Sequence, residues 1–371
     1  MTDHDYKQSA YYLIYLIRCV LTGKQPSKQR LEKIDTQKLI EVAREHSLSA
    51  VCAYALNAAG IKDAAFEEDK NKSIRKVILL DAQRMQIFAM LEQAGIWYLP
   101  LKGVFLKEYY PMIGMRQMAD NDVLFDMSRR GDVRKIMNEL GFTLNAEREV
   151  VDEYLKEPVY NFEMHGELFM GYQVGELADY FRGIPGRMIK DDENEYGYHL
   201  SDEDFYLFMI AHEYKHYKLG GTGIRSLVDT FVFINKFGSS LDWEYISSEL
   251  DKMGIRDYER RNYDLSMKLF GAVKLSAEEK KMLDYYIFSG TYGKAENLLD
   301  NRINEKDSKA KYILGRLATS TDRLKAANPI LYKHKMLIPF YVVKRYISLF
   351  TTKRKKVIKE LKYLFKKKKD N

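Results

Sequence analysis

The stretch over residues 96–126 constrains the fold of this chain more than any other part of it. An apolar run over residues 96–101 leads into a turn at Gly103, and an amphipathic segment follows. A second apolar run then begins beside Asp120 and Asp122. This order predicts a strand, a turn, a helix, a loop and a second strand.

Asp120 and Asp122 are separated by a single residue at the start of the second predicted strand. Successive side chains of a strand alternate between its faces, so we expect both carboxylates to project from the same face. Two carboxylates placed in this way repel each other unless a cation lies between them. The pair therefore predicts a cation site, although acidic residues also begin many strands for structural reasons.

Helices are predicted on both sides of this stretch, and two further strands are predicted after it. Glu163 and His165 share one face of the later strand, and Glu163 offers a third acid once the sheet forms. A capping box, Ser201-x-x-Asp204, predicts the start of another helix. The periodicity of apolar residues and the turn residues place helices over residues 6–20, 36–46, 48–59, 73–93, 128–140 and 224–237, and strands over 142–144 and 159–165.

The order of these motifs resembles the polymerase-β-like nucleotidyltransferase superfamily, and most closely its bacterial nucleotidyltransferase family with an LKG, Arg, Asp-x-Asp signature. The resemblance spans roughly residues 91–229. The residues that carry it are Leu101-Lys102-Gly103, Arg116, Asp120-Asn121-Asp122, Glu163, and Arg225 with Asp229.

The resemblance implies an enzyme that moves a nucleoside monophosphate from a nucleoside triphosphate, ATP among them, to an acceptor hydroxyl and releases pyrophosphate. It implies two Mg²⁺ ions held by Asp120, Asp122 and Glu163, which are also the implied catalytic residues. The acceptor hydroxyl could belong to a sugar, an antibiotic, a protein or RNA. The implied nucleotide-binding residues are Lys102, Gly103, Arg116 and Arg225.

Two positions depart from the superfamily pattern. Val104 follows the turn glycine where a Ser or a second Gly is usual, so this position supplies no hydroxyl to the phosphates. Asn121 stands between the aspartates in place of an apolar residue, and we expect a position that is not fully buried. A protein that keeps the fold without turnover, as a scaffold or binding protein, is the alternative from another functional class.

A competing motif, His212-Glu213-x-x-His216, matches the HExxH pattern of zinc metalloproteases. Catalytic zinc needs a third protein ligand, and the metzincin continuation is missing. Structurally, His212 could simply pack on an apolar helix face while Glu213 and Lys215 are solvated. The glycine-rich loop over residues 220–223 has no GxGxxG order, and we interpret it as a helix connection.

The predicted fold class is α+β, a small mixed-sheet core with helices packed on it, flanked by helical regions. The chain has 371 residues, which is too long for a single domain with one hydrophobic core. We expect a helical N-terminal region over 1–94, a nucleotidyltransferase core over 95–200, a helical region over 201–330 and a basic amphipathic tail over 331–371.

Composition favours a cytoplasmic protein. The two cysteines, Cys19 and Cys52, have neither CxxC spacing nor a partner cluster, and the apolar run near the N-terminus lacks the features of an export signal. The net charge of +7 arises from the last 19 residues, which contain ten Lys or Arg and two acids. This 351–371 tail could lie on an anionic membrane, giving peripheral attachment at the inner membrane face, could bind nucleic acid, or could be a solvated end.

Overall fold

The computed structural model describes residues 1–170, 174–291, 293, 294, 297, 301, 331 and 334–350. The chain divides into two compact units. The first comprises Met1–Tyr217 and Gly221–Tyr292, and the second comprises Lys218–Gly220 and Gly293–Asn371. All predicted site residues belong to the first unit.

The N-terminal part of the first unit is helical, as the sequence predicts. Short polar side chains accept hydrogen bonds from the first free amides of several helices: Thr2 does so for α1, Asp35 for α3 and Asp63 for α5. Because Asp63 caps α5, this helix begins nine residues before the expected Ser73. The helices are α1 (Asp3–Leu21), α2 (Lys28–Leu31), α3 (Thr36–Glu45), α4 (Ser49–Ala58) and α5 (Ala64–Gln93).

A five-stranded mixed sheet follows, with strand order β1-β2-β5-β4-β3. The two central strands, β2 and β5, are parallel, and the other neighbours are antiparallel. This confirms the predicted α+β class. The strands are β1 (Tyr98–Pro100), β2 (Asn121–Phe125), β3 (Thr143–Glu147), β4 (Val151–Lys156) and β5 (Tyr160–His165).

Strand β4 was not predicted from the sequence, and its omission is a correction. Its inward-facing positions include Asp152, which is buried and paired with Arg130 of α7 (Arg130–Glu139). A charged residue at an inward position breaks the alternation of apolar and polar residues that identifies a strand. Because Asp152 is buried only in its pair with Arg130, the sequence pattern did not identify this strand.

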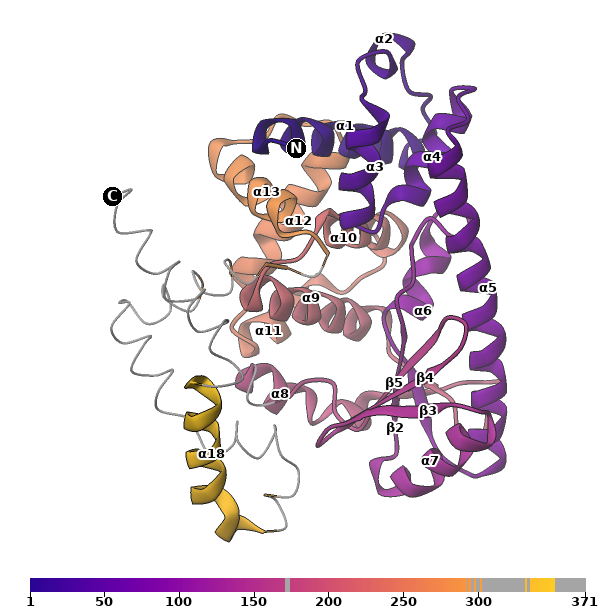
Figure 1. Ribbon diagram of the computed structural model, residues 1–371, viewed down its shortest axis with the longest axis vertical. Coiled ribbons are helices and arrows are strands. Elements are labelled where there is room, and N and C mark those ends of the chain that lie inside the picture. The colour runs from indigo at the N-terminus through magenta and orange to yellow at the C-terminus, as the bar shows by residue number, and fades with distance from the viewer. Residues whose placement is uncertain are drawn as a thin grey trace. The chain divides into compact units, whose positions relative to one another are not determined.

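The two faces of the sheet are covered differently. Val123 and Phe125 of β2, with Phe162 and Met164 of β5, pack in one apolar cluster with side chains of α5 and α7. Figure 1 shows the long helix α5 running beside the sheet. Asp122, Glu163 and His165 alternate with these residues, so their side chains lie on the opposite face.

Helices α9 (Asp202–Leu219) and α10 (Ile224–Phe237) complete the surroundings of that opposite face. Ser201 accepts a hydrogen bond from the Asp204 amide, as the capping box predicts, while the Asp204 carboxylate accepts one from Tyr245. The remaining elements are η1 (Lys107–Tyr109), η2 (Met127–Arg129), α8 (Gly175–Phe181), η3 (Ile184–Arg187), β6 (Ile189–Lys190), β7 (Tyr198–His199), α11 (Trp243–Lys252), α12 (Arg256–Phe270) and α13 (Ala277–Ser289).

In the second unit the structure describes η4 (Lys335–Leu337) and α18 (Ile338–Phe350), which lie within the basic amphipathic region expected over 331–371. The basic tail over residues 351–371, and most of residues 292–330 of the expected helical region, lie outside the described residues. Within the described part of the chain, no helix combines the length and apolar character needed to cross a membrane.

Candidate active site

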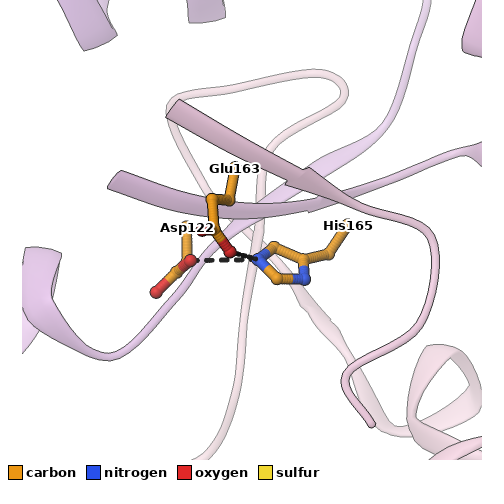
Figure 2. A group of neighbouring side chains, drawn as sticks. All are labelled: Asp122, Glu163 and His165. Atoms are coloured by element: carbon orange, nitrogen blue, oxygen red, sulfur yellow. Dashed lines mark hydrogen bonds and ion pairs between the residues drawn. The ribbon is translucent and has the colours of Figure 1, made fainter. Parts of the chain in front are cut away.

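Three side chains of the open sheet face converge at the centre of the sheet. Parallel pairing of β2 and β5 places Asp122 directly beside Glu163 and Leu124 beside His165. His165 Nε2 lies 2.9 Å from Asp122 Oδ1 and 3.5 Å from Glu163 Oε2 (Figure 2). One ligand atom from each residue lies within 4.8 Å of the other two, which is compatible with a single bound metal ion.

Asp120 lies in the same pocket but outside this group of three. Asp120 directly precedes the first residue of β2, and it lines the same pocket as Asp122. Burial, followed by the nearby charges of Asp122 and Glu163, raises the pKa of Asp120 to about 6. The acids are therefore close enough to repel each other.

Asp122 and Glu163 respond differently to their surroundings. Burial, with the negative charge of Asp122 added, raises the pKa of Glu163. Burial would also raise the pKa of Asp122, but the hydrogen bond and charge of His165 and the charge of Lys215 outweigh it, and this pKa is lowered. Asp122 is thus the more readily ionised of the two carboxyl groups.

The expectation that Asn121 is not fully buried is wrong. Its side chain is completely buried, and its Oδ1 accepts a hydrogen bond of 3.0 Å from Arg84 of α5. Asn121 points to the α5 side of the sheet, opposite Asp122. The polar residue between the aspartates therefore connects β2 to α5 and takes no part in the pocket.

The turn after β1 brings backbone close to the acids. Lys102 has a φ of +24°, a conformation that L residues rarely adopt, and Gly103 begins the four-residue helix α6 (Gly103–Leu106). A Cβ on Gly103 would lie 2.7 Å from Met118 Cε and 3.0 Å from Arg116 Nη1. A side chain at this position would displace the ends of the Met118 and Arg116 side chains.

Lys102 is held against α9. Its Nζ lies 3.1 Å from His212 Nδ1. Burial, with Arg116 and Arg225 nearby, lowers the pKa of Lys102 even though Glu213 and Asp229 act in the other direction. An anion entering the pocket would restore the preference of this amine for its charged form.

Arg116 is buried and fixed in orientation. Its Nε and Nη2 donate to Asp229 of α10 at 2.9 and 3.0 Å, and the Tyr110 hydroxyl donates to the same carboxylate at 2.6 Å. Burial would raise the pKa of Asp229, but Arg116 outweighs it and this pKa is lowered. Arg225, in the first turn of α10, donates to the Gln117 carbonyl at 3.1 Å.

The acids and cations described above line one pocket of about 310 Å³. This volume is at the lower end of the range for small-molecule sites. All seven predicted site residues line it: Lys102, Gly103, Arg116, Asp120, Asp122, Glu163 and Arg225. Acids from the sheet thus share a pocket with cations from the β1 turn and from α10.

A family model described as "Uncharacterised nucleotidyltransferase" matches residues 32–271. The chain belongs to this nucleotidyltransferase family. No curated protein and no solved structure matches it. The matched residues include every side chain of the pocket except Thr291.

In this nucleotidyltransferase the HExxH residues are not arranged as in a zinc protease. His212 and His216 line the pocket, with their Nε2 atoms 3.4 Å apart. Glu213 points away into the interior, where its Oε2 lies 3.4 Å from Asn262 Nδ2. Among the described residues neither histidine belongs to a group of metal-ligating side chains. The geometry therefore does not support the protease alternative.

Two further residues, His165 and Lys215, take part in the pocket although the sequence did not indicate them. Solvation of Lys215 was one alternative for the HExxH segment, but Lys215 lines the pocket, and burial, followed by the charge of Lys102, lowers its pKa to about 8. One signal could have identified it: residues at i, i+3 and i+4 share a helix face, so Lys215 lies beside His212 and His216. His165 was noted on the face of Glu163 but was not assigned to the acid cluster.

Proposed function

We propose that this nucleotidyltransferase moves a nucleoside monophosphate from a nucleoside triphosphate to an acceptor hydroxyl, with Mg²⁺ held by Asp120, Asp122 and Glu163. One observation carries the proposal: adjacent parallel strands place Asp122 beside Glu163, in a pocket that Lys102, Arg116, Lys215 and Arg225 also line. Negative groups that can bind metal ions and positive groups that can bind phosphates therefore line one cavity.

The donor atoms fit Mg²⁺. Asp122 and Glu163 contribute carboxylate oxygens within ligand distance of one another, and Asp120 lines the same pocket, where a cation would offset the repulsion among the three acids. His165 is a nitrogen donor that Mg²⁺ disfavours, and its ring, between Asp122 and Glu163, is suited to hold both carboxylates in place. The bound ions would neutralise the charge that develops on the reacting phosphate.

The reaction forms a bond between the acceptor oxygen and the α-phosphorus and breaks the bond from that phosphorus to the bridging oxygen of pyrophosphate. The hydroxyl proton passes to a base, and pyrophosphate leaves. Glu163 is suited to orient the hydroxyl or accept its proton, because it lies directly beside Asp122 and lines the same pocket.

The cations have separate tasks. Arg116 is oriented by Asp229, so its guanidinium offers a preorganised positive charge to the β- and γ-phosphates. Lys102 and Lys215 have lowered pKa values, which the arrival of a triphosphate would raise. Gly103 lets the backbone of the turn approach the same phosphates.

The test is incubation of the full chain with each labelled nucleoside triphosphate and Mg²⁺, followed by pyrophosphate release and mass spectrometry of added acceptors. We expect release by the wild type and a loss of about a thousandfold in Asp122→Asn, since metal ligation contributes several kcal/mol to such a transition state. Asp126→Asn is the matched control, because Asp126 caps the Ser128 amide at the end of the same strand and asparagine caps equally well.

Two results would contradict the proposal. Nucleotide binding without pyrophosphate release for any nucleotide and acceptor would favour the scaffold alternative. One tight zinc ion per chain that is lost in His212→Ala would favour the metalloprotease.

A further inference from the structure

A second hollow lies far from the acids in sequence and shares no lining residue with the catalytic pocket. It is a groove of about 960 Å³ between α1, the segment after α1, and the turn that joins α12 to α13. Helix α1 packs against α12 and α13, and Figure 1 shows these helices side by side. The proposed nucleotidyl transfer makes no use of this groove.

The lining of the groove is strongly basic. Six Lys and Arg side chains line it and no Asp or Glu does; these are Lys7, Arg18, Arg30, Lys33, Lys274 and Lys280. Lys7 is paired with Asp284. The other five make no ion pair within the part of the chain that the structure describes. Uncompensated cations along a concave surface attract a polyanion.

Tyrosine rings lie among these cations. Tyr11, Tyr12 and Tyr15 of α1 line the groove, and the Tyr11 side chain is 40% exposed. Arg30 and Arg18 lie over the Tyr15 ring, at 4.6 and 5.7 Å from its centroid. The Tyr15 hydroxyl accepts a hydrogen bond of 2.7 Å from the Ser27 amide, which fixes the ring. The exposed Tyr11 ring is therefore available for stacking at the same surface as the charges.

We propose that this groove binds single-stranded nucleic acid. Cations that follow a phosphate backbone, combined with aromatic rings on which bases stack, are the two requirements for such binding without strong sequence preference. An acidic polypeptide would use the cations but has no bases for the tyrosines. A lipid bilayer is too flat to enter a groove. The proposal is independent of the proposed nucleotidyl transfer.

The test uses the full chain and a fluorescein-labelled twelve-nucleotide oligo(U), with polyglutamate and anionic phospholipid vesicles as competitors. Arg30→Ala with Lys33→Ala removes two exposed cations of the groove. We expect affinity to fall about tenfold and the salt dependence to decrease by about 1.4 in the slope of log K against log salt, or about 0.7 for each lost phosphate contact. The matched control, Lys135→Ala with Arg260→Ala, removes cations with side chains 76% and 73% exposed outside the groove and should bind as the wild type.

Tyr11→Ala separates stacking from charge. We expect about fivefold weaker binding of oligo(U) and unchanged binding of polyglutamate, because only a base gains from the ring. Cross-linking of a 4-thiouridine oligonucleotide should label peptides that contain Tyr11 or Tyr15. The proposal is overturned if both groove variants bind oligo(U) as tightly as the wild type does. It is also overturned if polyglutamate or vesicles displace oligo(U) at equal charge concentration, or if cross-links fall only within residues 351–371.

Discussion

Asp152 and the pair Asp122 and Glu163 lie on the same sheet but differ in their charged partners. Asp152 of β4 is 2% exposed and accepts hydrogen bonds from Arg130 and Arg134 at 2.9 and 3.2 Å. Asp122 and Glu163, on neighbouring positions, have only His165 within ion-pair distance among the described residues. Two arginines of the chain pair with Asp152, whereas we propose that Asp122 and Glu163 bind a cation from outside. The first is expected to stabilise the fold, and the second to serve the reaction.

The largest expected effect is on the second pair. Glu163→Gln keeps the size of the side chain and removes its charge and its basicity. We expect pyrophosphate release to fall by about a thousandfold, equivalent to about 4 kcal/mol. Thermal unfolding without Mg²⁺ should be unchanged or shifted upwards, since a repulsive charge is removed. A variant that keeps full activity, or that unfolds, would abolish the contrast with Asp152.

The reverse pattern is expected at Asp152. Asp152→Asn leaves Arg130 and Arg134 without their shared carboxylate, and because both arginines are partly exposed we expect a loss of about 2 kcal/mol in the free energy of unfolding. Urea denaturation measures this loss. Pyrophosphate release per folded molecule should stay within about twofold of the wild type. A selective loss of activity would place Asp152 in the reaction instead.

Metal binding provides the next contrast. With Mg²⁺ at ten times its dissociation constant, the wild type should gain about 1.4 kcal/mol in the free energy of unfolding. Glu163→Gln should gain much less, and Asp152→Asn should gain as much as the wild type. Melting curves with and without Mg²⁺ show these shifts. Equal gains in all three proteins would indicate that the ion binds elsewhere.

The smallest effect is the pH dependence of Asp152. Burial would raise its pKa, but Arg130 and Arg134 outweigh burial and lower it. For an acid with a lowered folded-state pKa, the stabilisation is complete above the unfolded value of about 3.9 and is lost as the pH falls through the folded-state value. The wild type should therefore lose its advantage over Asp152→Asn below about pH 4. Denaturation curves at pH 7 and pH 3 test this, and a constant difference would contradict it.

The sequence predicted the parts of the fold whose signals are local. Thr36 to Glu45 and Ile224 to Phe237 were recognisable because apolar periodicity and capping residues act within a few positions. The pocket residues at the β1 turn and on β2 were found from residue order and family resemblance. Strand β4 was missed because Asp152 is buried only with a partner from another element.

The pairings across the pocket could not be predicted in the same way. Lys102 meets His212 and Arg116 meets Asp229 across more than a hundred positions each. No local pattern records such a contact, since it depends on where α9 and α10 dock. The position of Asp120 outside the group of three likewise depends on where β2 begins, and strand ends are set by tertiary pairing.

The parallel pairing of β2 and β5 has a consequence for synthesis of the protein. His165 of β5 contacts Asp122 of β2 across 43 positions. Strands β3 and β4 lie between them in the chain, and β4 forms antiparallel pairs with both β3 and β5. Hairpins close locally, whereas the parallel pair closes a long loop and is slower to form. A growing chain that has emerged only as far as β4 therefore carries Asp122 without Glu163. The carboxylates that we propose as metal ligands therefore come together only when β5 enters the middle of the sheet.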